Sequence, residues 1–276
     1  MHSQYDLDVK KGDRFEFGKN WSSFLRVLDE ERIAEACRSL ETMLGAGSIA
    51  GKTFLDVGSG SGLFSLAAMR LGAARVHSFD FDPNSVACTT ELRRRYFPDA
   101  ANWTVEQGSV LDADYIARLG SFDIVYSWGV LHHTGQMWQA LDHAARAVPS
   151  QGRLFIALYR DQGWLSKAWW QVKRLYNNGL AGRALVTGVF CAYFATTGFL
   201  FDLIRLKNPL RRYDEYKRSR GMSRLHDWID WIGGLPFEVS TPDAIDAFYK
   251  ARGFSQLRAN VLPSGHGCNE YLLIRS

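Results

Sequence analysis

The chain has 276 residues, enough for one sizeable domain with an insertion, and its 46% hydrophobic and 22% charged residues are ordinary for a globular protein. Its 33 basic and 29 acidic residues leave a net charge of only +4. Because the basic residues are spread along the chain, we expect no nucleic-acid partner. The four isolated cysteines form no C-x-x-C pair and the first residues are polar, so we expect a cytoplasmic protein with no metal site and no signal peptide.

Helical periodicity begins near the N-terminus. Apolar residues recur at helical spacing over residues 23–44, and Gly45 follows them, so the pattern predicts one helix that ends at this glycine. We interpret residues 1–50 as an N-terminal helical cap. Within it, Phe17 and Trp21 either close over a bound ligand as a lid or pack on the domain surface.

Beyond the cap, strand-like and helix-like segments alternate. The strands are "KTFLDVG", "ARVHSFD", "WTVEQ", "FDIVYSW" and "GRLFIALY", and helical patterns follow the first, second and fourth, which is typical of βαβ units and a parallel sheet. After residue 236 come a helix and two strands, "FSQLRANVL" and "NEYLLIR", whose short connecting loop predicts an antiparallel pair. The sequence thus predicts an α/β fold: a Rossmann-like, doubly wound, seven-stranded sheet with the last strand antiparallel, plus a mostly helical insertion after the fifth strand.

The turn "GSGSG" between the first strand and its helix is suited to close contact with a ligand. Glycine lets the backbone approach, and a helix N-terminus follows. The spacing does not match the dinucleotide fingerprint G-x-G-x-x-G, because Leu63 or Ser65 stands where the final glycine would be. This argues against an NAD(P)-dependent dehydrogenase.

Two acids flank this turn. Asp56 precedes the first glycine, where a carboxylate would oppose a pyrophosphate but suit a cationic ligand. Asp80 ends the second strand, where a carboxylate can accept both hydroxyls of a ribose. The pattern therefore predicts a ligand with a ribose and a cationic end.

Four motifs in order, "LDVGSGSG", "VHSFDFDP", "QGSVLD" and "FDIVYSWGVLHHT", resemble those of class I S-adenosylmethionine-dependent methyltransferases. The resemblance covers residues 51–159 and returns at 242–275, and the last motif is similar to that of the small-molecule branch, including ubiquinone-pathway O-methyltransferases. It implies S-adenosylmethionine as cofactor. The implied division is a cofactor-binding core over 51–159, a helical lid insertion over 160–236 and a C-terminal completion of the core over 237–276.

The resemblance also implies which residues contact the cofactor. We expect Asp56 at the methionine amino end, the glycine turn beneath the cofactor, and Asp80 on the ribose. The full set of expected cofactor contacts is Asp56, Gly58, Ser59, Gly60, Gly62, Asp80, Phe81 beside the adenine, Ser109, Val110 and Leu111 along its edge, Ser127 and Trp128 near the sulfonium, and Trp21 from the cap.

Methyl transfer to a hydroxyl needs its proton removed, so a base belongs in the site, and histidine is the residue type best suited to this. His133 follows the fourth strand at the ligand edge of the sheet. His266, between two glycines, and His226, beside Asp227, are further candidates. For each of the three, a packing or turn role is the alternative.

The insertion predicts an apolar acceptor pocket. "GWLSKAWWQVKRLY" has Leu165, Trp169, Val172 and Tyr176 on one helical stripe with basic residues among or opposite them, and residues 184–201 contain no charge. Either this second stretch is a buried lid helix, which could form a homodimer interface, or residues 164–206 contact a membrane peripherally at its inner face. We do not expect a membrane span.

Taken together, the sequence predicts a methyltransferase acting on an oxygen, less favourably a nitrogen, of a small and apolar or lipid-like acceptor. Two alternatives stay open: a non-catalytic S-adenosylmethionine-binding partner subunit, and an RNA or protein methyltransferase.

Overall fold

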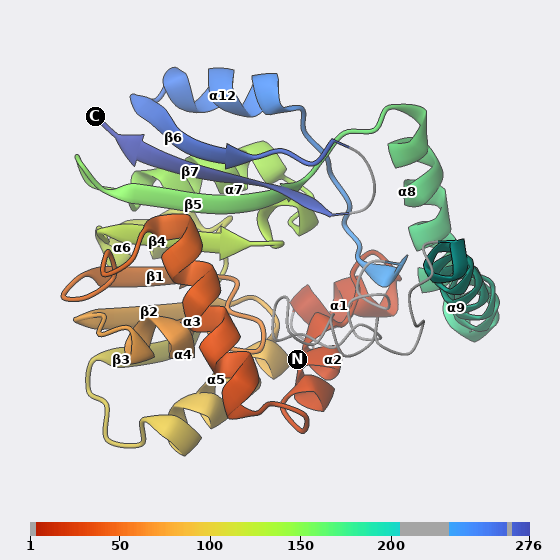
Figure 1. Cartoon of the computed structure of the whole chain (residues 1–276), viewed down its shortest axis with the longest axis horizontal. Coiled ribbons are helices and arrows are strands. Elements are labelled where there is room, and N and C mark those ends of the chain that lie inside the picture. Colours follow the sequence, from red (N-terminus) through yellow and green to blue (C-terminus); the bar gives the residue numbers. More distant parts are fainter. Residues whose placement is uncertain (1–3, 205–231, 264–266) are drawn as a thin grey trace.

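A computed structural model describes residues 4–204, 232–263 and 267–276 (Figure 1). Its centre is a seven-stranded sheet of order β3-β2-β1-β4-β5-β7-β6. The strands are β1 (Thr53–Val57), β2 (Arg75–Asp80), β3 (Trp103–Gln107), β4 (Ile124–Trp128), β5 (Arg153–Tyr159), β6 (Phe254–Asn260) and β7 (Cys268–Arg275). The first five are parallel, and β7 runs antiparallel to both β5 and β6. The predicted fold class is confirmed.

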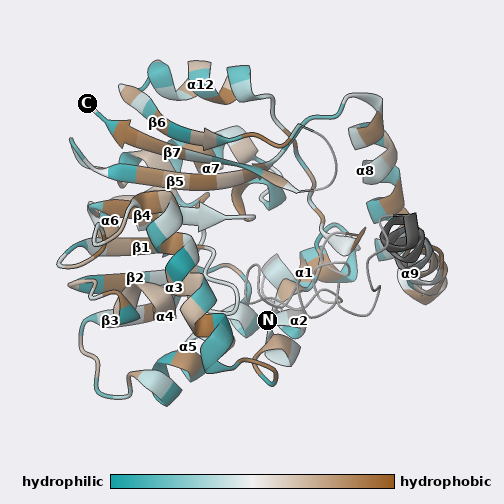
Figure 2. Ribbon diagram, viewed as in Figure 1, coloured by the Kyte–Doolittle hydropathy of each residue, from teal (hydrophilic) through white to brown (hydrophobic). Residues whose placement is uncertain are grey.

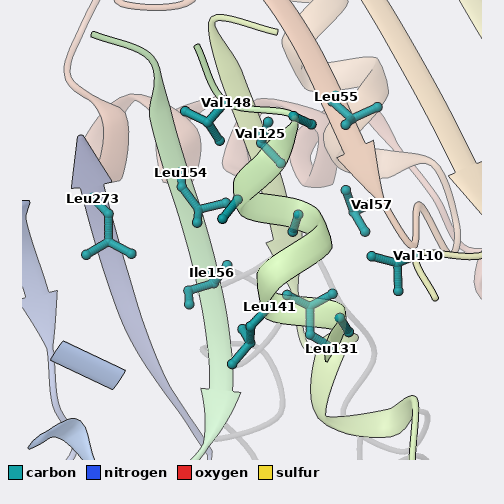
Figure 3. Close-up of a cluster of buried hydrophobic side chains, with 14 of the residues drawn as sticks. Leu55, Val57, Val110, Val125, Leu131, Leu141, Val148, Leu154, Ile156 and Leu273 are labelled. Atoms are coloured by element: carbon teal, nitrogen blue, oxygen red, sulfur yellow. The ribbon is translucent and has the colours of Figure 1, made fainter. Parts of the chain in front are cut away.

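Helices cover both faces of this sheet (Figure 1). One face carries α3 (Glu30–Leu44), α4 (Leu63–Arg70) and α5 (Pro83–Tyr96), and the other carries α6 (Ala113–Leu119), α7 (Met137–Arg146) and α12 (Pro242–Lys250). Successive strand residues point to opposite faces. In β1, Phe54 accordingly packs with the first group of helices and Leu55 with the second, whose aliphatic core is drawn in Figure 3.

The N-terminal cap differs from the predicted single helix over 23–44. The structure has α1 (Gln4–Lys10), α2 (Phe17–Phe24) and then α3, with a break at residues 25–29. Asp29 causes the break: its backbone is extended and its side chain accepts a hydrogen bond from the amide of Arg32 at 3.0 Å, as a helix N-cap does. The predicted stop at Gly45 is confirmed.

The carboxylate of Asp82 attaches the cap to the core. One of its oxygens accepts a bond from Asn84 N, as the N-cap of α5, and the other accepts from the amide of Gly18 at 2.7 Å. Gly18 lies in the first turn of α2. The second helix of the cap is thereby held at the edge of the sheet where β2 ends.

The part of the insertion that the structure describes is helical. It consists of α8 (Trp164–Asn177) and α9 (Gly179–Ile204), which pack against each other beside the sheet (Figure 1). Tyr176 of the predicted stripe is buried, whereas Leu165 is exposed. Lys173, one of the basic residues of this helix, is completely buried, with its Nζ 4.8 Å from the ring centre of Phe237.

Among the helices of the described ranges, none combines the length and apolar character that crossing a membrane requires. The limits of the insertion and of the other predicted divisions remain predictions.

Asp29→Ala should lower the free energy of unfolding by about 1 kcal/mol, because α3 loses its N-cap. Asp29→Asn keeps an oxygen that can cap and should lose less. Urea denaturation of the three proteins measures both effects. Equal stability of the wild type and the alanine variant would contradict the capping role.

Candidate functional site

A cavity of about 710 Å³ opens at the carboxyl edge of the sheet. It lies where β1 and β4 are neighbours and the strand order reverses, the usual ligand position in open α/β sheets. Its walls come from the turn after β1, the ends of β2, β4 and β5, and the cap helices α1 and α2. The volume lies in the range of small-molecule sites.

The glycine turn has a left-handed backbone at each glycine, with φ of 78° at Gly58, 54° at Gly60 and 81° at Gly62. An added Cβ would lie 2.3 Å from Val130 at the first position and 3.0 Å from the indole of Trp21 at the second. Gly58, Ser59 and Gly60 line the cavity as predicted. Gly62 is a correction, because it lies behind the wall and leaves room for Thr89 of α5 rather than for a ligand.

Four of the five amide groups of this turn donate hydrogen bonds within the protein. Gly58 N and Ser59 N both donate to Phe79 O, at 2.9 and 3.0 Å. Gly60 N donates to the carboxylate of Asp80, and Gly62 N donates to Ser59 O. An anion cradle needs free amides, so the turn does not suit a pyrophosphate, in agreement with the spacing argument.

Asp80 is fixed at the cavity wall through both of its oxygens. Oδ2 accepts from Gly60 N and Oδ1 from Asp82 N, each at 2.9 Å. Burial raises the pKa of Asp80 to about 6. Each carboxylate oxygen can accept a second hydrogen bond, so the group suits a pair of neighbouring hydroxyls such as those of a ribose.

Asp56 is held by a directional hydrogen-bond chain that starts on β3. Trp103 Nε1 can only donate, and it donates to Ser78 Oγ at 2.9 Å. The Ser78 hydroxyl then points to Ser65 Oγ at 2.7 Å, and Ser65 donates to Asp56 Oδ2. Burial raises the pKa of Asp56 to about 7, although the Ser65 bond acts in the opposite direction.

The predicted adenine contacts all lie on the cavity wall: Phe81, Ser109, Val110 and Leu111. Ser109 Oγ also accepts a bond from Leu111 N at 3.2 Å. Two neighbours of Phe81 were missed because the first residues show no periodicity. Tyr5 meets Phe81 edge-on with 5.8 Å between ring centres, and the guanidinium of Arg14 lies 5.0 Å from its ring centre.

Trp21 and Phe17 of α2 also line the cavity, as the lid prediction requires. Trp128 lines it too, and its Nε1 donates to Glu270 at 2.9 Å. Ser127 is a second correction: it is completely buried, and its hydroxyl donates to Val57 O behind the wall. The reason is the strand alternation, which turns successive side chains to opposite faces.

His133 lies on the cavity wall beside Phe17 and Tyr159, with ring centres 5.0 and 5.3 Å away. Its Nδ1 is 2.6 Å from Pro236 O. A carbonyl can only accept, so Nδ1 carries the hydrogen and Nε2 keeps its lone pair. His226 and His266 lie outside the described residues.

Burial, followed by the charges of Lys173 and Arg14, lowers the pKa of His133 to about 3, so the ring is neutral at physiological pH. Arg14 also donates to the carbonyl oxygen of His133 at 3.3 Å. This end of the cavity therefore combines aromatic rings with one neutral nitrogen acceptor.

S-adenosylmethionine fits the residues that are present. The glycine turn leaves no room for added Cβ atoms, so backbone alone forms that part of the wall. Asp56 offers a buried carboxylate to the cationic end of the cofactor, and Asp80 offers two acceptors to its ribose diol. Among the described side chains, no group of three or more His, Cys, Asp or Glu is placed to hold a metal ion.

Comparison with known proteins agrees with this site. The family description "Methyltransferase domain" matches residues 49–216. Ribosomal protein L11 methyltransferase from Anoxybacillus flavithermus is 31% identical over 123 residues, 40% of this chain and 39% of that protein. The Alteromonas mediterranea protein of the same name is 51% identical over 47 residues, 17% of this chain and 16% of its own. The matched stretches thus span well under half of these relatives.

Solved structures show the same fold. Magnesium protoporphyrin IX methyltransferase from Synechocystis, with bound S-adenosylmethionine, has a TM-score of 0.53 at 13% identity, over 93% of this chain and 84% of that one. An O-methyltransferase family protein from Burkholderia thailandensis has a TM-score of 0.51 at 14% identity, over 87% and 57% of the chains. With the family match over more than half of its length, this chain belongs to the methyltransferase domain family and has the fold of the S-adenosylmethionine-dependent methyltransferases.

Proposed function

We propose that the chain transfers a methyl group from S-adenosylmethionine to a hydroxyl oxygen of a small, mainly apolar acceptor. The observation that carries this proposal is the fixed tautomer of His133. Its Nε2 lone pair can accept a hydrogen bond from a hydroxyl, and the rings of Phe17 and Tyr159 offer apolar contacts around it.

When bound, S-adenosylmethionine supplies a methyl group that is already activated on a sulfonium. The protein then mainly has to hold and align the acceptor, which can contribute about 7–11 kcal/mol to lowering the barrier. Asp56 suits the ammonium end of the cofactor, and Asp80 suits its ribose hydroxyls. Phe17 and Trp21 would cover the site and exclude water.

The weak basicity of His133 favours oxygen over nitrogen as the acceptor atom. Burial and the charges of Lys173 and Arg14 lower the pKa of His133 to about 3. An aliphatic amine is protonated at neutral pH and would have to give a proton to this weak base before it could attack, whereas a hydroxyl oxygen already has a free lone pair. The one hydrogen of the hydroxyl bonds to His133 Nε2, which orients the oxygen. As the oxygen takes the methyl group its proton becomes strongly acidic, so the proton passes to Nε2 and from there to the solvent.

A direct test incubates the purified protein with S-adenosylmethionine and either the lipid or the aqueous fraction of a cell extract. We expect release of S-adenosylhomocysteine above the no-extract control, with the new methyl on oxygen by mass spectrometry. Tight cofactor binding without release would favour the non-catalytic partner subunit. Release only with extracted protein or RNA would favour the macromolecular methyltransferase.

His133→Ala should lower kcat about tenfold to a hundredfold and leave the affinity for S-adenosylmethionine within about threefold, because one oriented hydrogen bond to the acceptor is lost. His77→Ala is the matched control, since this histidine pairs with Glu106 away from the cavity. At saturating cofactor, kcat of the wild type should show no change near pH 6.5. Such a change, removed by His133→Ala, would make His133 a titrating base instead.

The affinity for S-adenosylmethionine should fall as pH falls through about 7, the pKa of Asp56 in the free protein. The cationic end of the ligand binds the ionised carboxylate, so full affinity exists above this pKa and Kd rises roughly tenfold from pH 8 to pH 6. Calorimetry across this range measures the effect. Asp56→Asn should bind more weakly with a flatter profile, whereas Asp123→Asn, outside the cavity, should keep the wild-type slope.

A further inference from the structure

The two described helices of the insertion carry an unusual exposed apolar surface. The four most exposed large hydrophobic side chains in the described part of the chain all lie there: Leu180 at 84%, Trp164 at 74%, Leu185 at 58% and Val189 at 55%. Soluble proteins normally scatter such residues singly, and a contiguous set marks an interaction site. We call the exposed side chains of Trp164, Leu175, Leu180, Leu185, Val189 and Tyr193 the hairpin surface.

Part of the hairpin surface forms a stripe along α9. Leu185, Val189 and Tyr193 are spaced by four residues, so they lie on one side of α9. The contact between the helices includes Trp169 and Phe190, whose ring centres are 5.1 Å apart. Both helices stand beside the sheet, and Figure 2 shows hydrophilic as well as hydrophobic stretches on α8. The prediction of a buried lid helix does not account for this exposure.

The charges of α8 and α9 are basic apart from Asp202 in the last turn of α9. Residues 162–201 contain no Asp or Glu, but they contain Lys167, Arg174 and Arg183, all exposed, besides the buried Lys173. The guanidinium of Arg174 lies 5.3 Å from the ring centre of Trp170. Apolar side chains with basic neighbours are typical of helices that lie in a membrane interface.

The charges also decide between a lipid surface and a second copy of this chain. In a two-fold dimer the same surface meets itself, so Lys167, Arg174 and Arg183 would meet the cations of the second copy. The acid that α9 contributes is Asp202, in its last turn, about five helical turns from Arg183. Burying unpaired like charges is unfavourable. Anionic lipid headgroups would neutralise the cations while the acyl boundary takes up the apolar side chains.

We propose that the hairpin surface docks the protein on an anionic lipid bilayer, with α8 and α9 lying in the interface. Because α8 begins shortly after Tyr159, docking would hold the cavity near the bilayer. The proposal concerns binding alone, so it does not depend on methyl transfer.

The test measures cosedimentation of the full chain with phosphatidylcholine vesicles, with or without one third phosphatidylglycerol. We expect binding to the anionic vesicles only, and weaker binding at high salt. Lys167→Gln, Arg174→Gln and Arg183→Gln together should lower the partition coefficient on the order of 100-fold. Trp164→Ser, Leu180→Ser and Leu185→Ser together should also abolish binding.

Matched controls change exposed residues elsewhere. Leu257→Ser on β6 and Arg94→Gln on α5 should bind vesicles like the wild type. Unchanged affinity for S-adenosylmethionine shows that each variant is folded. Absence of vesicle binding, or binding that survives both triple variants, would overturn the proposal. A concentration-dependent dimer in light scattering that Leu185→Ser dissociates, without vesicle binding, would assign the surface to self-association.

Discussion

The carboxylate of Asp80 is the interaction on which the site depends. It accepts the amide of Gly60 on one oxygen and the amide of Asp82 on the other, so it joins the glycine turn after β1 to the start of α5. Asp82 continues the connection by accepting the amide of Gly18 in the cap. Two neighbouring acids thus align three segments that are distant in the sequence around one cavity, before any ligand is present.

The sequence predicted those parts of the site that depend on backbone geometry. The backbone of the turn requires glycine at positions 58 and 60, and the ligand edge requires an acid at the end of β2. Such requirements involve residues close together in the sequence, so a short motif reveals them. Gly62 and Ser127 were assigned to the ligand but face other elements, because a motif lists neighbours in sequence without their orientation. Ser65 and Trp103 lie outside the motifs, and Ser78 lies within one that gives it no role, since the function of all three depends on the packing of three separate elements.

The sequence predicted the central sheet of the fold better than it predicted the N-terminal cap. Alternating strands and helices specify the parallel sheet, and the short loop before β7 specifies its direction. The cap was less predictable, because α1 and α2 are short and gain their stability from packing on the core rather than from periodicity. Lys173 shows the same limit: the helical pattern places it among or opposite the apolar stripe, and only tertiary packing shows that it is buried against Phe237.

The hydrogen-bond chain that begins at Trp103 determines where a proton on Asp56 resides. Every donor in that chain points toward Oδ2, which is therefore always an acceptor. A proton taken up near pH 7 is therefore carried by Oδ1, the oxygen that this chain of hydrogen bonds does not reach. A cationic ligand would then exchange directly with that proton, and its binding would release one hydrogen ion to the solvent without disturbing the interior network.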